Sequence, residues 1–537
     1  MEKEIKKYIQ WVIVSLMIIF NSSCVELDKD ALDVLSTGSF WQNESDAKLA
    51  LVGVYKSTGT DFWSSTNAIR MDAATDNAYS KDFNGWDDAL SLEMTPENVI
   101  LSSVWSAGYK KIAKCNNFLE NIGNAEMDEN KKREMIAEVR FIRAYQYFWL
   151  TNFFGDIPLV TNILDFNTAN HVTRDPKTTI ISFLYKELSE SAVDLPTTRI
   201  ASEKGRVNRG AALAMKGRLQ MSEKKWSEAA TTFKTIIDMG VFMIDPNYQN
   251  IFLEAGEKSN EIILAAQYLP TDYSWSQKGV LPSQYGGGYG TIKVVEDLVG
   301  AYLMKDGKAK ESSPLYNPNQ PFINRDPRLY YSIFLPGFTK FQGKTYQAHP
   351  DSTGGDQDRV PINSSSGYYA KKFIDESLGA ITNYGGDIVL IRYAEVLLNY
   401  LESKIEAGNT IDQNLLDLTI NQLRLRASVS MPIVTETNPG LLRDIVRRER
   451  RIELAFEGPL RIWDLMRWRI AHEKLVGKFY GMKITNDPSN YTKFEVNENG
   501  NVFVVNRIGM DPDINYLWPI PQSERDINGN LTQNSGY

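Results

Sequence analysis

The segment at residues 131–160 is too apolar on too many sides to fold as a helix on the protein surface. Two lines of apolar residues recur along it at three- and four-residue steps, which is the spacing of an α-helix. The first line comprises Met135, Val139, Ile142, Tyr145, Trp149 and Phe153, and the second comprises Ala137, Phe141, Ala144 and Phe148. Because both faces must be covered, we predict a helix packed between two neighbours. It should end near Gly155, and Pro158 prevents its continuation.

Other parts of the chain repeat the pattern of paired helices. Residues 206–239 contain an Ala-rich helical pattern, a short Glu-Lys-Lys turn and a second helical pattern. A small residue followed by a large one four positions later, as at Ala144 and Phe148, resembles tetratricopeptide-type helix pairs. A third candidate pair spans residues 391–423, without a strict period of about 34 residues. With 537 residues, the chain should form at least two lobes or one solenoid-like array with insertions.

Strands are expected to be accessory to these helices. Between residues 243 and 383 the helical pattern gives way to Gly, Pro, Tyr, Asn and Ser, which predicts long loops and insertions. Residues 494–505 alternate apolar and polar side chains around Asn499-Gly500, which predicts a type I′ β-hairpin. The predicted fold class is therefore mainly α, with a tetratricopeptide-like helix-pair scaffold, long loop-rich insertions and a few short β-hairpins.

Composition excludes several functions. The 59 Lys and Arg residues are dispersed among 67 Asp and Glu residues, for a net charge of −8, so no basic stripe indicates nucleic acid. Only two cysteines and three histidines are present, which argues against a Cys/His metal site or a disulfide scaffold. We predict neither a metal nor a cofactor. Aromatic residues make up 11% of the chain, more than a helical core needs, so some of them should be exposed.

No catalytic set can be recognised. The Gly286-Gly287-Gly288 run lacks the Lys-Ser/Thr of a P-loop and the strand-to-helix setting of a dinucleotide site. A Gly-x-Ser-x-Gly nucleophile elbow is also missing from the sequence. Paired carboxylates for glycoside hydrolysis can always be chosen from 67 acids, and sequence alone cannot place two of them across a sugar ring. A glycosidase therefore stays an alternative.

The N-terminus has the organisation of a secretion signal. Lys3, Lys6 and Lys7 precede an apolar run of about 13 residues, which is short of the roughly 20 that span a bilayer as a helix. We predict a signal peptide at residues 1–23. Asn21-Ser22-Ser23-Cys24 resembles a bacterial lipoprotein signal, although Asn21 stands where leucine is usual. The alternative is a secreted protein with an incidental cysteine.

The lipoprotein resemblance implies that Cys24 becomes the mature N-terminus and carries acyl chains such as palmitate, which anchor a protein firmly when several are present. Residues 24–40 would then form a lipidated tether. The acidic stretch at residues 25–30 is similar to the tract that directs some lipoproteins of the Bacteroidetes to the outer face of the outer membrane. The alternative is that this acidic stretch is only a solvated tether.

Five stretches occur in order along the mature chain: Phe40-Trp41 with Gly53-Val54-Tyr55, residues 138–158, Asn324-Arg325-Asp326-Pro327-Arg328, residues 447–468, and Trp518-Pro519-Ile520-Pro521 with residues 530–537. Together they resemble the SusD/RagB family of outer-membrane nutrient-binding lipoproteins. Ser535 departs from the proline that family members often have there. The resemblance implies a SusD-like N-terminal helical region at residues 41–250 and a RagB/SusD C-terminal region at residues 251–537 with loop-rich ligand-binding insertions.

The function that the resemblance implies is binding without catalysis. The protein would capture an oligo- or polysaccharide on the extracellular side of the outer membrane and deliver it to a SusC-like TonB-dependent transporter. A peptide-binding RagB-like lipoprotein, a surface glycoside hydrolase and a purely structural plug for the transporter are the alternatives. The motif arginines, Trp463 and Phe154 are expected to hold the scaffold together, and Arg140 and Arg143 to pair with neighbouring helices.

Ligand contacts are expected in two polar loops that carry aromatic residues. Trp and Tyr rings stack on the apolar faces of sugar rings, while Asp, Asn and Arg hydrogen-bond the hydroxyls. The candidates are Trp86, Tyr79, Asp76 and Asn77 in the first loop, and Trp275, Tyr285 and Tyr289 in the second. The alternative for each is structural, because a loop aromatic often pins its own loop to the core. On the ligand-binding hypothesis, Trp86→Ala lowers glycan affinity and leaves thermal stability nearly unchanged.

Overall fold

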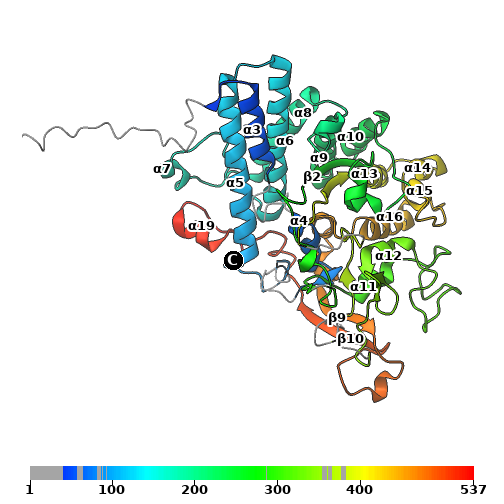
Figure 1. The fold of residues 1–537 in the computed structure, drawn as a ribbon. Helices are drawn as coiled ribbons and strands as arrows, with labels where there is room; N and C mark the ends of the chain where they lie inside the picture. The colour runs from blue at the N-terminus through cyan, green and yellow to red at the C-terminus, as the bar shows by residue number, and fades with distance from the viewer. Residues whose placement is uncertain are drawn as a thin grey trace, which may run out of the picture.

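The computed structural model describes residues 40–56, 65–80, 86, 89–91, 93–285, 287–352, 360, 366–376 and 382–537 (Figure 1). The predicted signal peptide, Cys24 and nearly all of the tether lie outside these residues. Among the described helices, none combines the length and the apolar character that crossing a bilayer requires.

The larger helices form a layer in which neighbours along the chain are also neighbours in space. Each packs against the next, from α5 through α6, α8, α9 and α10 to α13, and α13 packs on α16 (Figure 1). Their bounds are α5 Val99–Asn121, α6 Glu129–Phe154, α8 Lys177–Asp194, α9 Arg209–Ser222, α10 Trp226–Asp238, α13 Tyr393–Glu406 and α16 Pro439–Glu453. The prediction of a mainly helical scaffold built from packed helix pairs is confirmed.

Helix α6 is the predicted central helix, and it lies between α5 and α8. The Asp128 side chain accepts hydrogen bonds from the first turn. At the other end Gly155 has a φ of 76°, and its N–H donates to the Thr151 carbonyl at 3.0 Å. On the α8 side, Arg143 pairs with Glu187 at 2.7 Å. The predictions of a helix between two neighbours, an end at Gly155 and an interhelical role for Arg143 are all confirmed.

Small residues bring α9 and α10 close together, as the sequence predicts. A Cβ atom added at Gly217 would lie 2.4 Å from the ring of Phe233, so no larger residue fits without moving the helices apart. Arg140 supports the neighbouring interface, where its guanidinium pairs with Glu187 at 2.8 Å. The helix-pair packing therefore depends on particular small residues and on interhelical ion pairs.

The third predicted helix pair is only partly correct. Residues 388–392 form a strand, and the second helix divides into α14 and α15 at Thr419, where φ is −122° and ψ is −101°. Periodicity alone could not show this break. The shorter helices are α3 Glu44–Tyr55, α4 Ser65–Arg70, α7 Phe166–Ala169, α11 Glu296–Ala301, α12 Pro327–Ser332, α14 Gln413–Leu418, α15 Ile420–Arg424, α17 Leu460–Arg467, α18 Ala471–Lys474 and α19 Gln522–Ile527.

The strands form small antiparallel sheets. Those described are β1 Ala78–Tyr79, β2 Ile262–Ala266, β3 Lys293–Val294, β4 Ile333–Phe334, β5 Lys340–Phe341, β6 Lys344–Thr345, β7 Tyr369–Ala370, β8 Ile388–Arg392, β9 Val476–Lys483 and β10 Asn501–Ile508. One sheet has the order β1-β3-β7-β4, while β2 pairs with β8, β5 with β6 and β9 with β10.

The second strand of the hairpin predicted at residues 494–505 pairs mainly with a segment outside that hairpin. A turn forms at residues 497–500, where the Gly500 N–H donates to the Asn497 carbonyl at 2.9 Å, but it is not the predicted type I′ turn, because Gly500 has a positive φ of 78° and Asn499 does not. The pairing across this turn is short, with a bridge between Val496 and Val502 and a hydrogen bond from the Phe503 N–H to the Glu495 carbonyl at 2.9 Å, whereas β10 pairs along its length with β9. The alternation of apolar and polar residues identified a strand, but it could not show whether that strand pairs within the predicted hairpin or with an earlier segment.

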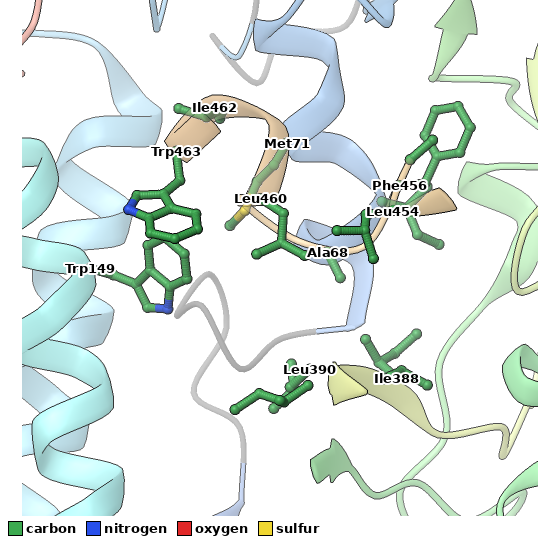
Figure 2. Close-up of a cluster of buried hydrophobic side chains, with 14 of the residues drawn as sticks. Ala68, Met71, Trp149, Ile388, Leu390, Leu454, Phe456, Leu460, Ile462 and Trp463 are labelled. Carbon is green, nitrogen blue, oxygen red and sulfur yellow. The ribbon is translucent and has the colours of Figure 1, made fainter. Parts of the chain in front are cut away.

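The C-terminal half closes onto the helical layer through a buried apolar cluster. Figure 2 shows Trp463 of α17 beside Trp149 of α6, with Ala68 and Leu460 nearby. The indole N–H of Trp463 donates to the Ser222 hydroxyl at 3.0 Å. Phe154 is also fully buried. The predicted scaffold role of Trp463 and Phe154 is confirmed, because both rings lie inside the core.

A buried network of charges ties together segments far apart in the sequence. Glu453 of α16 pairs with Arg328 of α12 and Arg392 of β8 at 2.7 Å each, and with Arg426 at 3.0 Å. Glu261 pairs with Arg392 and Arg426 from the opposite side, at 2.8 and 3.1 Å. Burial by itself raises the pKa of Glu453, but the three arginines outweigh it and hold that pKa well below its usual range. The scaffold role expected for the motif arginines is thus confirmed for Arg328.

Candidate functional site

Asp76 and Asn77 of the first predicted loop connect elements of the scaffold. Asp76 accepts from Arg461 at 2.8 and 2.6 Å and pairs with Arg451 at 3.3 Å. Burial opposes ionisation of Asp76, yet the two arginines keep its pKa well below the usual range. The Asn77 amide donates to Asp72 at 3.1 Å, and its oxygen accepts from Arg451 at 2.7 Å. Both side chains are therefore engaged by protein partners.

Most of the predicted stacking rings are buried. Trp86 is 2% exposed and packs edge-on against Trp518, with ring centroids 6.4 Å apart. Trp275 is buried too, and its indole N–H donates to the Gly386 carbonyl at 2.9 Å. Tyr285 lies inside an aromatic cluster, 4.9 Å from Phe341. These rings pin their loops to the core, which is the structural alternative that the sequence left open.

The other two predicted rings are more accessible. Tyr79 of β1 is half-buried, whereas Tyr289 is 71% exposed. Ligand contact by the seven predicted residues stays a prediction, and for Trp86, Trp275 and Tyr285 it would require the rings to leave their present packing. The sequence located loops that carry aromatic residues, but it could not show which way each ring points.

A cleft of about 1470 Å³ lies between the segment that follows α11 and the β9–β10 hairpin, which are neighbours in Figure 1. Of the seven predicted residues, only Asp76 lines it. Its aromatic lining comprises Tyr316, Phe322, Phe338, Tyr368, Phe479 and Tyr480, and its uncharged polar lining includes Asn319, Gln320, Thr485, Asn486, Asn497, Asn499 and Asn501. We take this cleft as the candidate functional site.

Part of the aromatic lining forms a packed group. The rings of Phe338 and Phe322 lie 6.2 Å apart, and Phe322 lies at the same distance from Tyr368. Tyr330 stacks on Phe338 from outside the cleft, with centroids 4.9 Å apart and planes inclined by 29°. Phe322 and Phe338 are half-buried, so each ring is supported by protein and also partly accessible. Such a surface can receive the apolar face of a sugar or another flat group.

The hairpin contributes Phe479 and Tyr480, which are half-buried residues of β9. Tyr480 packs edge-on against Phe503 of the paired strand, 6.3 Å away. Asn501, at the start of β10, donates to the Gly481 carbonyl at 2.8 Å and so fixes the two strands where they border the cleft. Aromatic rings thus come from the hairpin as well as from the segment after α11.

Sequence analysis missed these cleft residues. Phe322 stands two residues before the Asn324–Arg328 motif, and Phe479-Tyr480 stands between the Arg447–Trp468 stretch and the predicted hairpin. The only available signal was the closeness of these aromatics to the family stretches. They come together because β9 lies against α11, a contact between distant segments that the sequence did not reveal.

No metal or reactive thiol can be assigned in the described ranges. Within them, no group of three or more His, Cys, Asp or Glu side chains is placed to hold a metal ion. Cys115 is buried, as the sequence predicts, and burial raises the pKa of its thiol to about 12. The thiol is therefore protonated at neutral pH and acts as a small packing group.

Nearly the whole chain is similar in sequence to known proteins. Residues 255–537 match the model of the SusD family, and residues 30–221 match a model described as starch-binding, associating with outer membrane. A SusD-like protein of Formosa agariphila is 24% identical over 86% of this chain and 90% of that protein. The starch-binding protein SusD of Bacteroides thetaiotaomicron is 22% identical over 100% of this chain and 99% of that protein.

The similarity extends to a solved structure. The crystal structure of a SusD-like carbohydrate-binding protein from Bacteroides fragilis matches with a TM-score of 0.86 and 38% identity, over 92% of this chain and 100% of that chain. The matched family model covers more than half of the sequence, and the resemblance noted from the five stretches is confirmed. The chain therefore belongs to the SusD family.

Proposed function

We propose that the protein binds an oligo- or polysaccharide in the cleft, without catalysis, and delivers it to a SusC-like TonB-dependent transporter. The observation that carries this proposal is the cleft of about 1470 Å³, lined by six aromatic rings and by several carboxamide side chains. The names of the relatives support it, since one is a starch-binding protein and another a SusD-like carbohydrate-binding protein.

The chemistry of the cleft suits a sugar chain better than a small apolar ligand. Sugar rings present C–H groups on one face, which pack on aromatic rings, and hydroxyls around the edge, which need donors and acceptors. The side chains of Asn486 and Asn499 offer both donors and acceptors. The rings and amides stand on strands and on packed segments, so little ordering is required when a ligand binds.

Removing one ring from each side of the cleft tests this proposal. Tyr316→Ala and Tyr480→Ala are each expected to weaken binding of the preferred glycan by about 1–2 kcal/mol, because each loses a stacking surface. Isothermal titration calorimetry of the full-length protein in detergent, across a panel of polysaccharides, measures the affinity. The matched control is Phe166→Ala, since that ring is 85% exposed on α7 and lies outside the cleft lining.

Other results would favour the alternative functions. If no glycan binds and peptides do, the protein belongs with peptide-binding uptake lipoproteins. Release of reducing ends from a bound polysaccharide would establish a glycoside hydrolase. Absence of affinity for any glycan or peptide would favour a structural plug. Equal affinity of wild type and both tyrosine variants for a glycan would move the binding site away from the cleft.

We infer that Cys24 anchors the protein to the outer membrane with its bulk on the extracellular side. The description of the matched family model supports membrane association. Cys24→Ala is expected to shift most of the protein from the membrane fraction to the soluble fraction, because the acyl chains would be lost. Fractionation and metabolic labelling with palmitate measure this change. Unchanged membrane association and unchanged labelling would contradict the anchor at Cys24.

Delivery to a transporter has its own test. If the protein acts with a SusC-like partner, mild detergent extraction of the outer membrane should co-isolate it with a TonB-dependent transporter. Deleting that transporter should abolish uptake of the bound glycan while leaving glycan binding at the cell surface intact. Uptake that continues without the transporter would contradict the delivery step.

A further inference from the structure

One arginine in the basic run of α16 differs from its neighbours. Arg447 lies over the ring of Trp468 at 4.7 Å, and Arg450 pairs with Asp464 at 2.9 Å. Arg448 lines the cleft and is half-buried. Within the part of the chain that the structure describes, its side chain makes no hydrogen bond and no ion pair. Its guanidinium donors are therefore available to a molecule in the cleft.

The acids near Arg448 do not neutralise it. Glu449, the next residue, pairs with Arg328 at 2.7 Å, and Asp444, one turn earlier on α16, forms no ion pair with Arg448. Burial lowers the pKa of Arg448, which shows that its surroundings disfavour the unpaired charge. An anionic group would relieve this cost, and a guanidinium matches the planar geometry of carboxylates and sulfates with two parallel N–H donors.

The charge of the cleft differs in sign from the charge of the chain. Seven Lys and Arg residues and five Asp and Glu residues line the cleft, whereas acids outnumber bases in the whole sequence. Two of these bases and two of these acids pair with each other, Arg451 with Asp297 and Lys310 with Glu296, each at 2.7 Å, and Lys478 pairs with Glu495 at 2.7 Å. Arg325 is buried and its guanidinium donates to backbone carbonyls, so it adds a positive charge without an acidic partner among the described residues.

We propose that the ligand of the cleft is an acidic glycan, whose carboxylate or sulfate group is bound by Arg448. This inference rests on the proposed glycan-binding function and names the class of glycan. Lys474 of α18 and Lys483 of β9 also line the cleft, and both are exposed. They add longer-range attraction for a negatively charged chain, which weakens as salt is raised.

The test uses polysaccharides that differ only in charge. Calorimetry with the full-length protein in detergent compares a panel of acidic polysaccharides with their uncharged counterparts, such as galacturonan with its methyl ester and dextran sulfate with dextran. In a pair of which at least one member binds, the acidic polysaccharide is expected to bind at least about tenfold more tightly than its uncharged counterpart. Carboxylated and sulfated members of the panel distinguish the two kinds of anionic group.

Variants of Arg448 connect this preference to one side chain. Arg448→Gln is expected to weaken binding of the acidic glycan about tenfold and to leave binding of an uncharged glycan unchanged, while Arg448→Lys keeps part of the affinity. Thermal stability should not fall, because no protein partner is lost. The matched control is Arg443→Gln on the same helix, where Arg443 pairs with Glu406 at 2.6 Å and lies outside the cleft lining.

Two results would overturn the inference and are separable from failure of the proposed function. The first is equal affinity for the charged and uncharged members of each pair that binds. The second is an Arg448→Gln variant that binds the acidic glycan as tightly as wild type does. Either result would contradict the preference for an acidic glycan, while glycan binding itself would still be established. If no member of the panel binds, the proposed glycan-binding function itself is contradicted.

Discussion

Replacing Glu453 by glutamine is expected to destabilise the protein by about 3–5 kcal/mol, because three buried arginines would lose the charge that they surround. The Glu453 carboxylate lies 2.7 Å from Arg328 and from Arg392, and 3.0 Å from Arg426. Glutamine keeps the shape of the side chain and removes only its charge. Equilibrium unfolding in guanidinium chloride, followed by circular dichroism, measures the free energy of unfolding.

The control for this substitution is Glu498→Gln. Glu498 is exposed near the turn between residues 494 and 505, so its replacement should change the free energy of unfolding by less than about 0.5 kcal/mol. A loss of less than about 1 kcal/mol for Glu453→Gln would mean that the arginines are stabilised by other partners. Glu261, which pairs with Arg392 and Arg426, would be the first such partner to examine.

Trp86→Ala is expected to cost about 3–5 kcal/mol of stability, since it removes a large buried ring from the core. Trp86 packs on Trp518, and Trp518 stacks on Phe153 with ring centroids 4.5 Å apart. The burial of Trp86 favours the packing alternative over the ligand-binding hypothesis, which predicted little change in stability. Guanidinium unfolding of wild type and variant measures the difference.

Tyr289→Ala is the matched control for Trp86→Ala, because Tyr289 was predicted from the same reasoning and is 71% exposed. Its replacement should leave the free energy of unfolding within about 0.5 kcal/mol of wild type. If Trp86→Ala instead left stability unchanged and lowered glycan affinity, Trp86 would be a ligand contact, and the loop would have to adopt a second arrangement when a glycan binds.

Much of the helical scaffold could be predicted from local patterns. The two apolar lines of α6 and its end at Gly155 follow from helical periodicity and from the conformational freedom of glycine. The prediction failed where the periodic pattern of apolar residues was compatible with more than one structure. The two cases are the break at Thr419 and the choice of β9 as the partner of β10.

The candidate site was the least predictable part. The rings of Trp86, Trp275 and Tyr285 were correctly recognised as loop aromatics, yet they are buried, because apolar loop residues lower their free energy by packing on the nearest part of the core. The cleft depends instead on Tyr316 and Tyr480, from segments more than 150 residues apart. No local pattern marks two residues as lining one cavity.

The family resemblance and the helical class follow from the amino-acid sequence, because periodic apolar faces and five ordered stretches are properties of the chain and need no coordinates. Which side chains face the cleft, and which charged groups among the described residues have no partner, depends on how distant segments pack. Arg448 and Arg450 stand two residues apart on one helix, but Arg450 pairs with Asp464 inside the core and Arg448 faces the cleft. That difference arises because neighbouring positions on a helix point in different directions, and the surrounding elements decide which direction is inside.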